Sequence, residues 1–436
     1  MAQKKKHQSK FTESLVPSGV PNDWKLTSVG SLLSHTEYGL SEPGDSEGDT
    51  PIVGMKDLVA GRVVLSNLAT INGDGIDVDK LRLHKGDILL NRTNSPDLVG
   101  KVGIVREDAD AVFASYLVRL AVNEDAVDAD FLSEWLNGEI AQRAIKRIAT
   151  RAVSQANVNP TEFKKYCPVL LPPTSIEQQG IAAILRCWDD ATDIQDSMIK
   201  QANDLHAFLV RSLVFGESQI FSGSDRKKQK HRWFTLPDNW GCQRIDDLAC
   251  EVSERHQNAE APVILSCSKY DGFVRSLDYF KKQVFSSDLR GYKRIYRGDF
   301  GFPSNHVEEG SIGLQDITDV GLVSPIYIVF RFSSDKIDNE YAHYVLKTRL
   351  YRHIFEVSTS ASVDRRGSLR WKDFATIPFP VPPLQEQRQI VQVLHASAQR
   401  IESLRTQKSL IEEQKRGLMQ KLLTGTWRVN NAGGES

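Results

Sequence analysis

Residues 171–181 read LPPTSIEQQGI, and residues 381–390 read VPPLQEQRQI. The two stretches share a pair of prolines, a Glu-Gln pair and an isoleucine, and their glutamates, Glu177 and Glu386, lie 209 positions apart. A segment that returns in this way is typical of a duplicated chain.

Three further matches occur in the same order on both sides of this stretch. They are VPNDW at 20–24 with LPDNW at 236–240, KGD at 85–87 with RGD at 297–299, and LVFG at 213–216 with LLTG at 422–425. The spacing falls only from 216 to 209 positions along the chain. We therefore interpret the sequence as a tandem duplication of about 210 residues.

The first part of each copy, roughly 20–173 and 236–383, mixes short β-rich runs with turn residues. Strands are predicted over 86–90, 102–105, 116–120 and 326–332, and helical stretches over 130–148 and 339–355. Each copy should thus begin with a mixed α and β domain. The Pro-Pro pair closes that domain, because proline cannot continue a β-ladder but fits the start of a helix.

The second part of each copy is predicted to be one helix of about 40 residues, on the order of 60 Å long. Steps of four and three residues give a mostly apolar seam in both copies, which is typical of a coiled coil. An amphipathic helix packed on a core is the alternative. The seam positions are Ile181, Leu185, Trp188, Thr192, Gln195, Ile199, Ala202, His206, Leu209 and Leu213, and then Ile390, Leu394, Ser397, Ile401, Leu404, Lys408, Ile411, Lys415, Leu418 and Leu422.

Together these features predict an α+β protein with two tandem mixed α/β domains separated by two long antiparallel helices that form a coiled coil. Parallel helices would place both domains at one end, whereas antiparallel helices relate them by an approximate two-fold axis. Duplex DNA is itself locally two-fold, and half-sites one turn apart lie roughly 34 Å from each other. The antiparallel arrangement therefore suits a protein that contacts two half-sites.

Composition sets wider bounds. The 436 residues are 40% hydrophobic and 25% charged, as in soluble globular proteins of two or three domains. Five scattered cysteines without a C-x-x-C pair favour reduced thiols. We find no apolar run of the roughly 20 residues that a bilayer requires and no hydrophobic segment after the basic start, so the predicted location is the cytoplasm. The net charge of −1 leaves DNA binding open, with basic runs at 4–10 and 226–232 that could equally be solvated tails.

Candidate DNA contacts lie where the two copies diverge, at 91–94 against 303–306 and at 151–157 against 360–366. These stretches are rich in the Arg, Asn, Gln and Ser side chains that hydrogen-bond bases and phosphates, although surface loops are commonly polar. The candidates are Arg92, Thr93, Asn94, Ser154, Gln155, Asn157, Lys269, Tyr270, Ser304, Asn305, His306, Arg365, Arg366, Arg370 and Trp371. Candidate partner contacts on the helices, which could instead be coiled-coil core, are Trp188, Leu209, Leu404 and Leu418.

The whole pattern resembles the specificity subunit of type I restriction–modification systems. The resemblance rests on the two Pro-Pro hinges, on the RGD at 297–299, on GSIG at 310–313 and on VSPIYIVF at 323–330, although the first hinge carries one extra residue. It implies two target-recognition domains and a bipartite, asymmetric DNA target. It also implies two methyltransferase (modification) subunits that bind S-adenosylmethionine, and translocating nuclease (restriction) subunits, using ATP and Mg²⁺, that can attach.

With that resemblance, the predicted boundaries are a basic N-terminal tail at 1–19, target-recognition domain 1 at 20–173 and a spacer helix at 174–217. A basic linker at 218–235, target-recognition domain 2 at 236–383, a second spacer helix at 384–426 and a tail at 427–436 follow.

Motifs for chemistry within this chain are missing from the sequence. It has no phosphate-binding G-x-x-x-x-G-K-[ST], no G-x-G-x-x-G, no zinc-type Cys/His spacing and no Asp or Asn before Pro-Pro-Tyr or Pro-Pro-Phe. Ser95 to Lys101 fits a turn better than a nuclease cluster, and His306 and His343 lack a partner that would make them bases. We expect a non-catalytic subunit without a cofactor or metal of its own. The alternatives are a coiled-coil scaffold with two protein-binding domains, or an enzyme with an unrecognised site.

Overall fold

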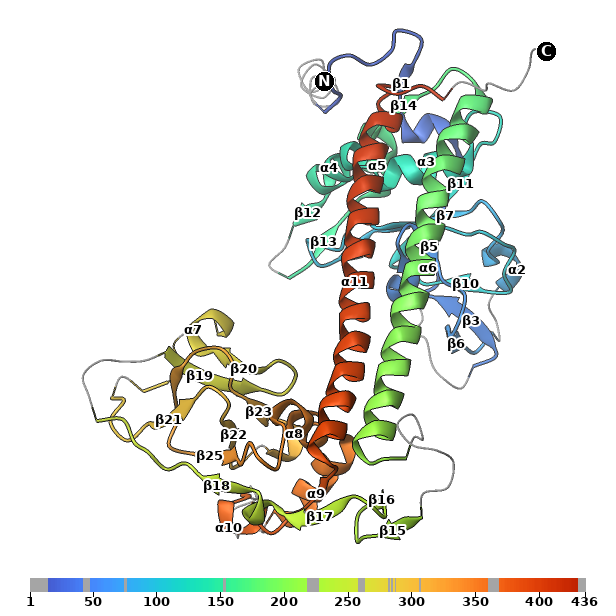
Figure 1. Cartoon of the computed structure of the whole chain (residues 1–436). Coiled ribbons are helices and arrows are strands. Elements are labelled where there is room, and N and C mark those ends of the chain that lie inside the picture. Colours follow the sequence, from blue (N-terminus) through green and yellow to red (C-terminus); the bar gives the residue numbers. More distant parts are fainter. Residues whose placement is uncertain are drawn as a thin grey trace, which may run out of the picture. The chain divides into compact units, whose positions relative to one another are not determined.

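The computed structural model describes residues 15–41, 48–73, 77–151, 154–217, 227–257, 263–280, 283, 285–286, 288–305, 307–359 and 368–429. The chain divides into two compact units (Figure 1). Unit 1 consists of residues 1–197 and 406–436, and unit 2 consists of residues 198–405. The two predicted long helices, α6 (Ser175–Val214) and α11 (Leu384–Leu423), have 40 residues each, and each contributes one segment to each unit.

Unit 1 is built around a six-stranded sheet with the order β2-β11-β7-β9-β5-β4. Its strands are β2 (Leu33–Tyr38), β11 (Leu117–Val122), β7 (Ile88–Asn91), β9 (Val102–Ile104), β5 (Arg62–Val63) and β4 (Leu58–Val59). A three-stranded sheet joins β10 (Val112–Phe113), β3 (Thr50–Val53) and β6 (Ala69–Ile71), and β1 (Lys25–Ser28) pairs with β14 (Pro168–Leu171). The short helix α2 (Val78–Leu81) precedes β7, and α5 (Pro160–Tyr166) precedes β14.

Unit 2 repeats the main pairings of unit 1. The four-stranded sheet β18-β25-β22-β23 contains β18 (Ala249–Glu251), β25 (Tyr327–Phe332), β22 (Phe300–Pro303) and β23 (Gly313–Leu314). A second sheet, β20-β19-β24-β21, contains β20 (Gly272–Arg275), β19 (Val263–Ser268), β24 (Val320–Val323) and β21 (Lys293–Tyr296). The pair β17 (Gly241–Arg244) with β26 (Pro378–Val381) corresponds to β1 with β14, and β22 with β25 corresponds to β7 with β11. The remaining elements are β15 (Lys228–Lys230), β16 (Thr235–Pro237), α7 (Ser276–Tyr279) and α10 (Trp371–Phe374).

Each helical stretch predicted from the sequence is two helices. Residues 130–148 form α3 (Ala129–Asn137) and α4 (Glu139–Ile148), separated by Gly138, whose backbone is extended at φ −70° and ψ 158°. Residues 339–355 belong to α8 (Asn339–Leu346) and α9 (Arg349–Ser358), and the Thr348 side chain caps α9 by accepting from Tyr351 N–H. Gly138 starts α4 without a side-chain cap, so the first break rests on its extended backbone, whereas at the second break the Thr348 side chain caps the new helix.

Within unit 1 the segments of α6 and α11 run antiparallel, as predicted. Lys415 Nζ lies 2.6 Å from Asp189 Oδ1, and Lys408 Nζ lies 2.6 Å from Asp196 Oδ1. Moving seven residues up one helix thus moves seven residues down the other, the repeat of a heptad seam. Two seam positions that are not apolar therefore hold lysines that pair with aspartates of the facing helix.

The buried Gln of each hinge explains the repeated Glu-Gln pair. In unit 2, Gln387 Oε1 accepts from Asp338 N–H at 2.8 Å, and its Nε2 donates to the carbonyls of Pro382 and Lys336, both at 2.9 Å. In unit 1, Gln178 repeats the first two contacts with Asp128 N–H at 2.9 Å and Pro172 O at 3.3 Å. Each glutamine thus ties the start of a long helix to the N-cap of the domain helix beside it.

Each long helix ends at a glycine that fits against a tryptophan corner. Gly425 (φ +71°) ends α11, and a Cβ there would come within 2.6 Å of Pro21 and 3.1 Å of Trp24. Gly216 (φ +63°) ends α6 and approaches Pro237 and Trp240 in the same way. The left-handed backbone and the lack of space both require glycine. The LVFG and LLTG matches are therefore two copies of one helix end.

Candidate nucleic-acid interface

The two divergent stretches of copy one meet in unit 1. The strand β13 (Ala156–Asn157) pairs on one side with β12 (Thr150–Arg151) and on the other with β8 (Thr93–Asn94), and Asn157 lies opposite Thr93 in the register. Ser154, Gln155 and Asn157 are exposed, and Thr93 and Asn94 are partly exposed. The structure therefore places Thr93, Asn94 and Asn157 on one small sheet, and Ser154 and Gln155 in the hairpin loop between β12 and β13.

Arg92, between β7 and β8, is fixed next to this sheet. Its N–H donates to Tyr116 O at 3.0 Å, and its carbonyl accepts from Val158 N–H at 2.8 Å. Its Nε donates to Ser115 O at 3.2 Å, and the guanidinium carbon lies 5.2 Å from the centre of the Tyr38 ring. Tyr38 and Tyr116 are exposed side chains that the sequence argument missed.

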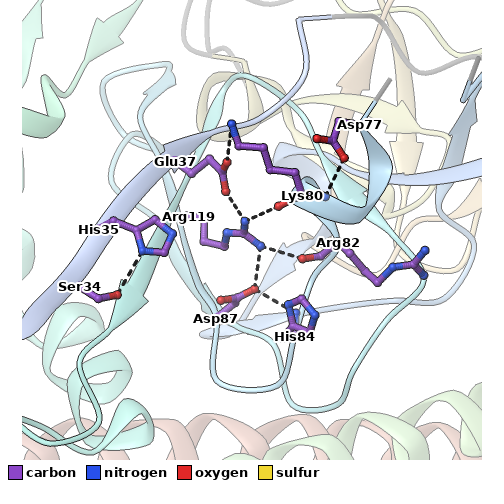
Figure 2. A network of polar contacts seen from close by, with 9 residues as sticks. All are labelled: Ser34, His35, Glu37, Asp77, Lys80, Arg82, His84, Asp87 and Arg119. Carbon is purple, nitrogen blue, oxygen red and sulfur yellow. Dashed lines mark hydrogen bonds and ion pairs between the residues drawn. The ribbon is translucent and has the colours of Figure 1, made fainter. Parts of the chain in front are cut away.

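A buried polar network supports the edge of the sheet on which Tyr38 lies (Figure 2). The Arg119 guanidinium of β11 is almost fully buried, ion-pairs with Glu37 of β2 and with Asp87, and donates to the carbonyls of Arg82 at 2.7 Å and Lys80 at 2.8 Å. Buried charges are stable in a fold only when they are paired and hydrogen-bonded. This network joins β2, β7 and β11 to the residues around α2.

The corresponding position in unit 2 brings together four of the predicted residues. Ser304 N–H donates to Ile326 O at 3.2 Å, and Ser304 O accepts from Leu369 N–H at 2.8 Å. This second bond repeats the contact between Arg92 and Val158, and it places Ser304 and Asn305 beside Arg370 and Trp371. Arg370 is exposed, whereas the Trp371 ring is partly buried and lies 5.8 Å from Phe330 and 5.9 Å from Phe374.

Three predicted residues, His306, Arg365 and Arg366, lie outside the described residues. Lys269 and Tyr270 lie elsewhere in unit 2, in the turn between β19 and β20. Lys269 O accepts from Lys347 Nζ at 2.9 Å, and the Tyr270 side chain is 82% exposed. Within the described residues, neither Lys269 nor Tyr270 makes a hydrogen bond or ring contact with Ser304 or Arg370. The DNA contacts of all these residues remain predictions.

The predicted partner contacts on the helices lie largely in packed surroundings. Leu404 is buried, Leu209 and Leu418 pack against the cores of units 2 and 1, and Trp188 is partly buried. The exposed apolar side chains of the two long helices lie at positions off the predicted seam, and it is contiguous groups of such side chains that mark contact surfaces. They are Ile176, Ile194, Met198, Leu205, Phe208 and Leu410.

Unit 1 also contains a buried ion cluster between α3 and the two long helices. Glu134 lies 3.6 Å from Lys415 Nζ, which also contacts Asp189. Burial raises the pKa of Glu134 to about 6, against the lowering effect of Lys415. In unit 2, burial lowers the pKa of His343 to about 4, which keeps the imidazole neutral near pH 7.

Arg428 closes the N-terminal end of unit 1. Its guanidinium contacts both Asp23, at 2.8 Å, and Glu177 of the first hinge, at 2.6 Å. Its hydrogen bonds to these carboxylates raise the pKa of Arg428, and its hydrogen bond to Asp23 lowers the pKa of that carboxyl. The glutamate of the first hinge is thus paired with a residue that follows α11.

The described residues contain no group of three or more His, Cys, Asp or Glu side chains placed to hold a metal ion. None of the helices in this part of the chain combines the length and the apolar content that crossing a bilayer requires.

The model of the type I restriction modification DNA specificity domain matches residues 21–203 and 294–413, which together make up more than two thirds of the chain. The chain therefore belongs to the family of type I restriction–modification DNA specificity subunits.

Two individual relatives extend this match over 94% of the chain. A putative type I restriction enzyme MjaX specificity subunit from Methanocaldococcus jannaschii is 24% identical over 422 residues, covering 94% of this chain and 95% of the relative. The MjaVIII specificity subunit of the same organism is 23% identical over 433 residues, covering 94% and 95%. The EcoBI specificity subunit of Escherichia coli is 26% identical over 190 residues, covering 42% of this chain and 38% of the relative.

Solved structures share the fold. A chain from a structural study of the assembly and conformational transition of a type I restriction–modification system has a TM-score of 0.60 and 15% identity, covering 94% of this chain and 100% of that one. The specificity subunit from M. genitalium has a TM-score of 0.52 and 16% identity, covering 93% and 97%. The predicted α+β fold with two recognition domains and two long helices is thereby confirmed. The protein is a DNA-specificity subunit that acts with partner subunits of a restriction–modification complex.

Proposed function

We propose that the chain reads a bipartite, asymmetric DNA target, one half-site through unit 1 and the other through unit 2. The observation that carries this proposal is the small sheet of unit 1, which gathers residues 92–94 and 154–157 next to two exposed tyrosines. Unit 2 has the same backbone contact at Ser304 but different side chains. Similar scaffolds with different contact residues are expected to select different sequences.

We further propose that the chain directs two methyltransferase subunits to this target, and two restriction subunits where they are present. The curated relatives are described as specificity subunits of type I restriction enzymes, which supports this reading over that of a scaffold for unrelated proteins. In this proposal the methyltransferase subunits bind S-adenosylmethionine, the restriction subunits bind ATP and Mg²⁺, and the present chain holds no cofactor and catalyses no step. The proposed complex acts on cellular DNA in the cytoplasm.

The test is selection from a random-sequence duplex library with the full chain co-purified with its methyltransferase subunits. We expect an enriched motif with two specified blocks separated by unspecified positions. Affinity for this motif should fall steeply with salt, because each neutralised phosphate releases counterions. A protein scaffold would enrich no motif and show no salt-dependent affinity for DNA, and that result would overturn the proposal.

Two matched variants test the assignment of one half-site to each unit. Asn94→Ala in unit 1 and Asn305→Ala in unit 2 remove amides from corresponding loops. Each should relax one block of the motif and leave the other unchanged. If either variant relaxed both blocks, the division of labour between the units would be wrong.

A further inference from the structure

Arg92 differs from the paired arginines of unit 1 in having no carboxylate partner within the part of the chain that the structure describes. Arg119, Arg106 and Arg428 each contact at least one acidic side chain. Arg92 instead uses only its Nε, which donates to the carbonyl of Ser115, so that neither Nη atom has a hydrogen-bond partner among the described residues. The positive charge and four N–H donors therefore remain available on a partly exposed side chain.

The guanidinium group is nevertheless held in place. The backbone of Arg92 is fixed on both sides by Tyr116 and Val158, and its Nε by Ser115. The Tyr38 ring, 5.2 Å from the guanidinium carbon, lies within the range of a cation–π contact. Tyr38 in turn belongs to β2, which pairs with β11 over Thr36, Glu37 and Tyr38 above the buried Arg119 network. The two Nη atoms are thus presented as a pre-oriented fork.

We propose that Arg92 reads a guanine in the half-site of unit 1, with its two Nη groups donating to O6 and N7. This inference rests on the proposed function. An arginine fork that donates end-on to O6 and N7 is the commonest base-specific contact in the major groove. A fork already held by a tyrosine ring and a carbonyl loses less conformational freedom on binding than a free arginine does. A phosphate can accept the same fork but carries no base identity, so the dependence of binding on sequence separates the two contacts.

The two copies differ at this position, so the proposed guanine contact belongs to unit 1 alone. Ser304, which repeats the backbone contact of Arg92 in unit 2, has a hydroxyl group in place of the fork. The guanine should therefore appear in one block of the motif, with no equivalent specified by Ser304.

The experiment measures the Kd of the full chain with its methyltransferase subunits for two duplexes. One is the selected motif, and the other has one G·C pair of the unit 1 block replaced by A·T; each guanine of the block is tested in turn. Wild type should bind the parent duplex about 5- to 150-fold more tightly than one of the replaced duplexes, as expected for a bidentate contact. Arg92→Ala should bind the parent duplex and that replaced duplex with equal Kd. Its Kd for the replaced duplex should equal that of wild type.

Further variants separate a base contact from general effects. Arg92→Lys keeps the charge but not the planar fork held by Tyr38 and Ser115, so it should reduce the preference for guanine. Tyr38→Leu removes the stacking ring and should reduce that preference, whereas Tyr38→Phe should restore it. Arg143→Ala, which removes an exposed cation that pairs with Glu139 on α4, is the control and should leave the motif unchanged.

Three outcomes would overturn the inference while leaving the proposed function intact. In the first, Arg92→Ala loses the same affinity on every duplex, which marks a phosphate contact. In the second, Arg92→Ala binds the parent duplex as tightly as wild type does. In the third, the selected block of unit 1 contains no guanine. If wild type selected no motif at all, the proposed function itself would fail.

Discussion

Replacing Gln387 with alanine is expected to destabilise unit 2 by about 3–5 kcal/mol. The side chain is fully buried, and its amide makes three hydrogen bonds of 2.8–2.9 Å, to Asp338 N–H and to the carbonyls of Pro382 and Lys336. Each of the three buried backbone groups that loses its partner costs about 1–3 kcal/mol. Water that enters the space left by the side chain satisfies part of this loss, so the expected cost lies near the lower end of the summed range.

The matched control is Gln178→Ala in unit 1. Gln178 makes two recorded hydrogen bonds, of which one is 3.3 Å long, so the expected loss is about 2 kcal/mol. Urea unfolding followed by circular dichroism gives the free energies, and hydrogen exchange of peptides from the start of α8 reports on the N-cap directly. Because the two glutamines lie in different units, the Gln387 variant should increase exchange at Asp338 and the first turn of α8 specifically.

The argument from the hinge would be refuted by a loss below about 1 kcal/mol for the Gln387 variant, or by unchanged exchange at α8. A Gln178 variant that lost more stability than the Gln387 variant would also contradict it, since the ranking follows from the number and length of the bonds.

Three other predictions follow from the cores and the ion cluster. Glu134→Gln should gain stability relative to wild type by about 2 kcal/mol as the pH rises from about 4.5 to 7, because a carboxyl with a raised pKa of about 6 destabilises the fold once it ionises. Urea titrations at several pH values test this, and a stability difference that does not change with pH would contradict it. Gly425→Ala should cost about 1–3 kcal/mol, since φ is +71° and the added Cβ would meet Pro21 at 2.6 Å; an unchanged Tm would show that the helix end adapts freely. Leu404→Ala, at a side chain that is 1% exposed, should lower the free energy of unfolding by about 2–5 kcal/mol, whereas Leu410→Ala, at one that is 51% exposed, should change it by less than about 0.5 kcal/mol. Equal losses in urea unfolding would show that the buried face of α11 is assigned wrongly.

The sequence was sufficient for the features that depend on periodicity. The matches around the two hinges predicted two copies, and the apolar seam predicted two helices of about 40 residues, which α6 and α11 confirm. The breaks at Gly138 and Thr348 were missed, because the apolar pattern continues across both and only the extended backbone of Gly138 and the cap at Thr348 mark them.

Contacts between residues far apart in the chain could not be predicted. Lys415 and Asp189 are 226 positions apart, and nothing in the local sequence of either indicates the other. The same holds for Arg92, which was chosen from a polar loop, whereas its fixed position comes from Tyr38 on β2 and from Ser115 in the turn before β11. Tyr38 and Tyr116 were missed because a single aromatic residue in a strand usually faces the core.

The composition of unit 1 from residues 1–197 and 406–436 has a consequence for synthesis of the chain. Unit 2 is one continuous segment and is complete once residue 405 has left the ribosome, so the part encoded second is the first that can finish folding. Unit 1 waits for Lys415, Gly425 and Arg428, which fill its core, its helix end and its first hinge. A premature stop near the end of the message would therefore damage the domain that was translated first.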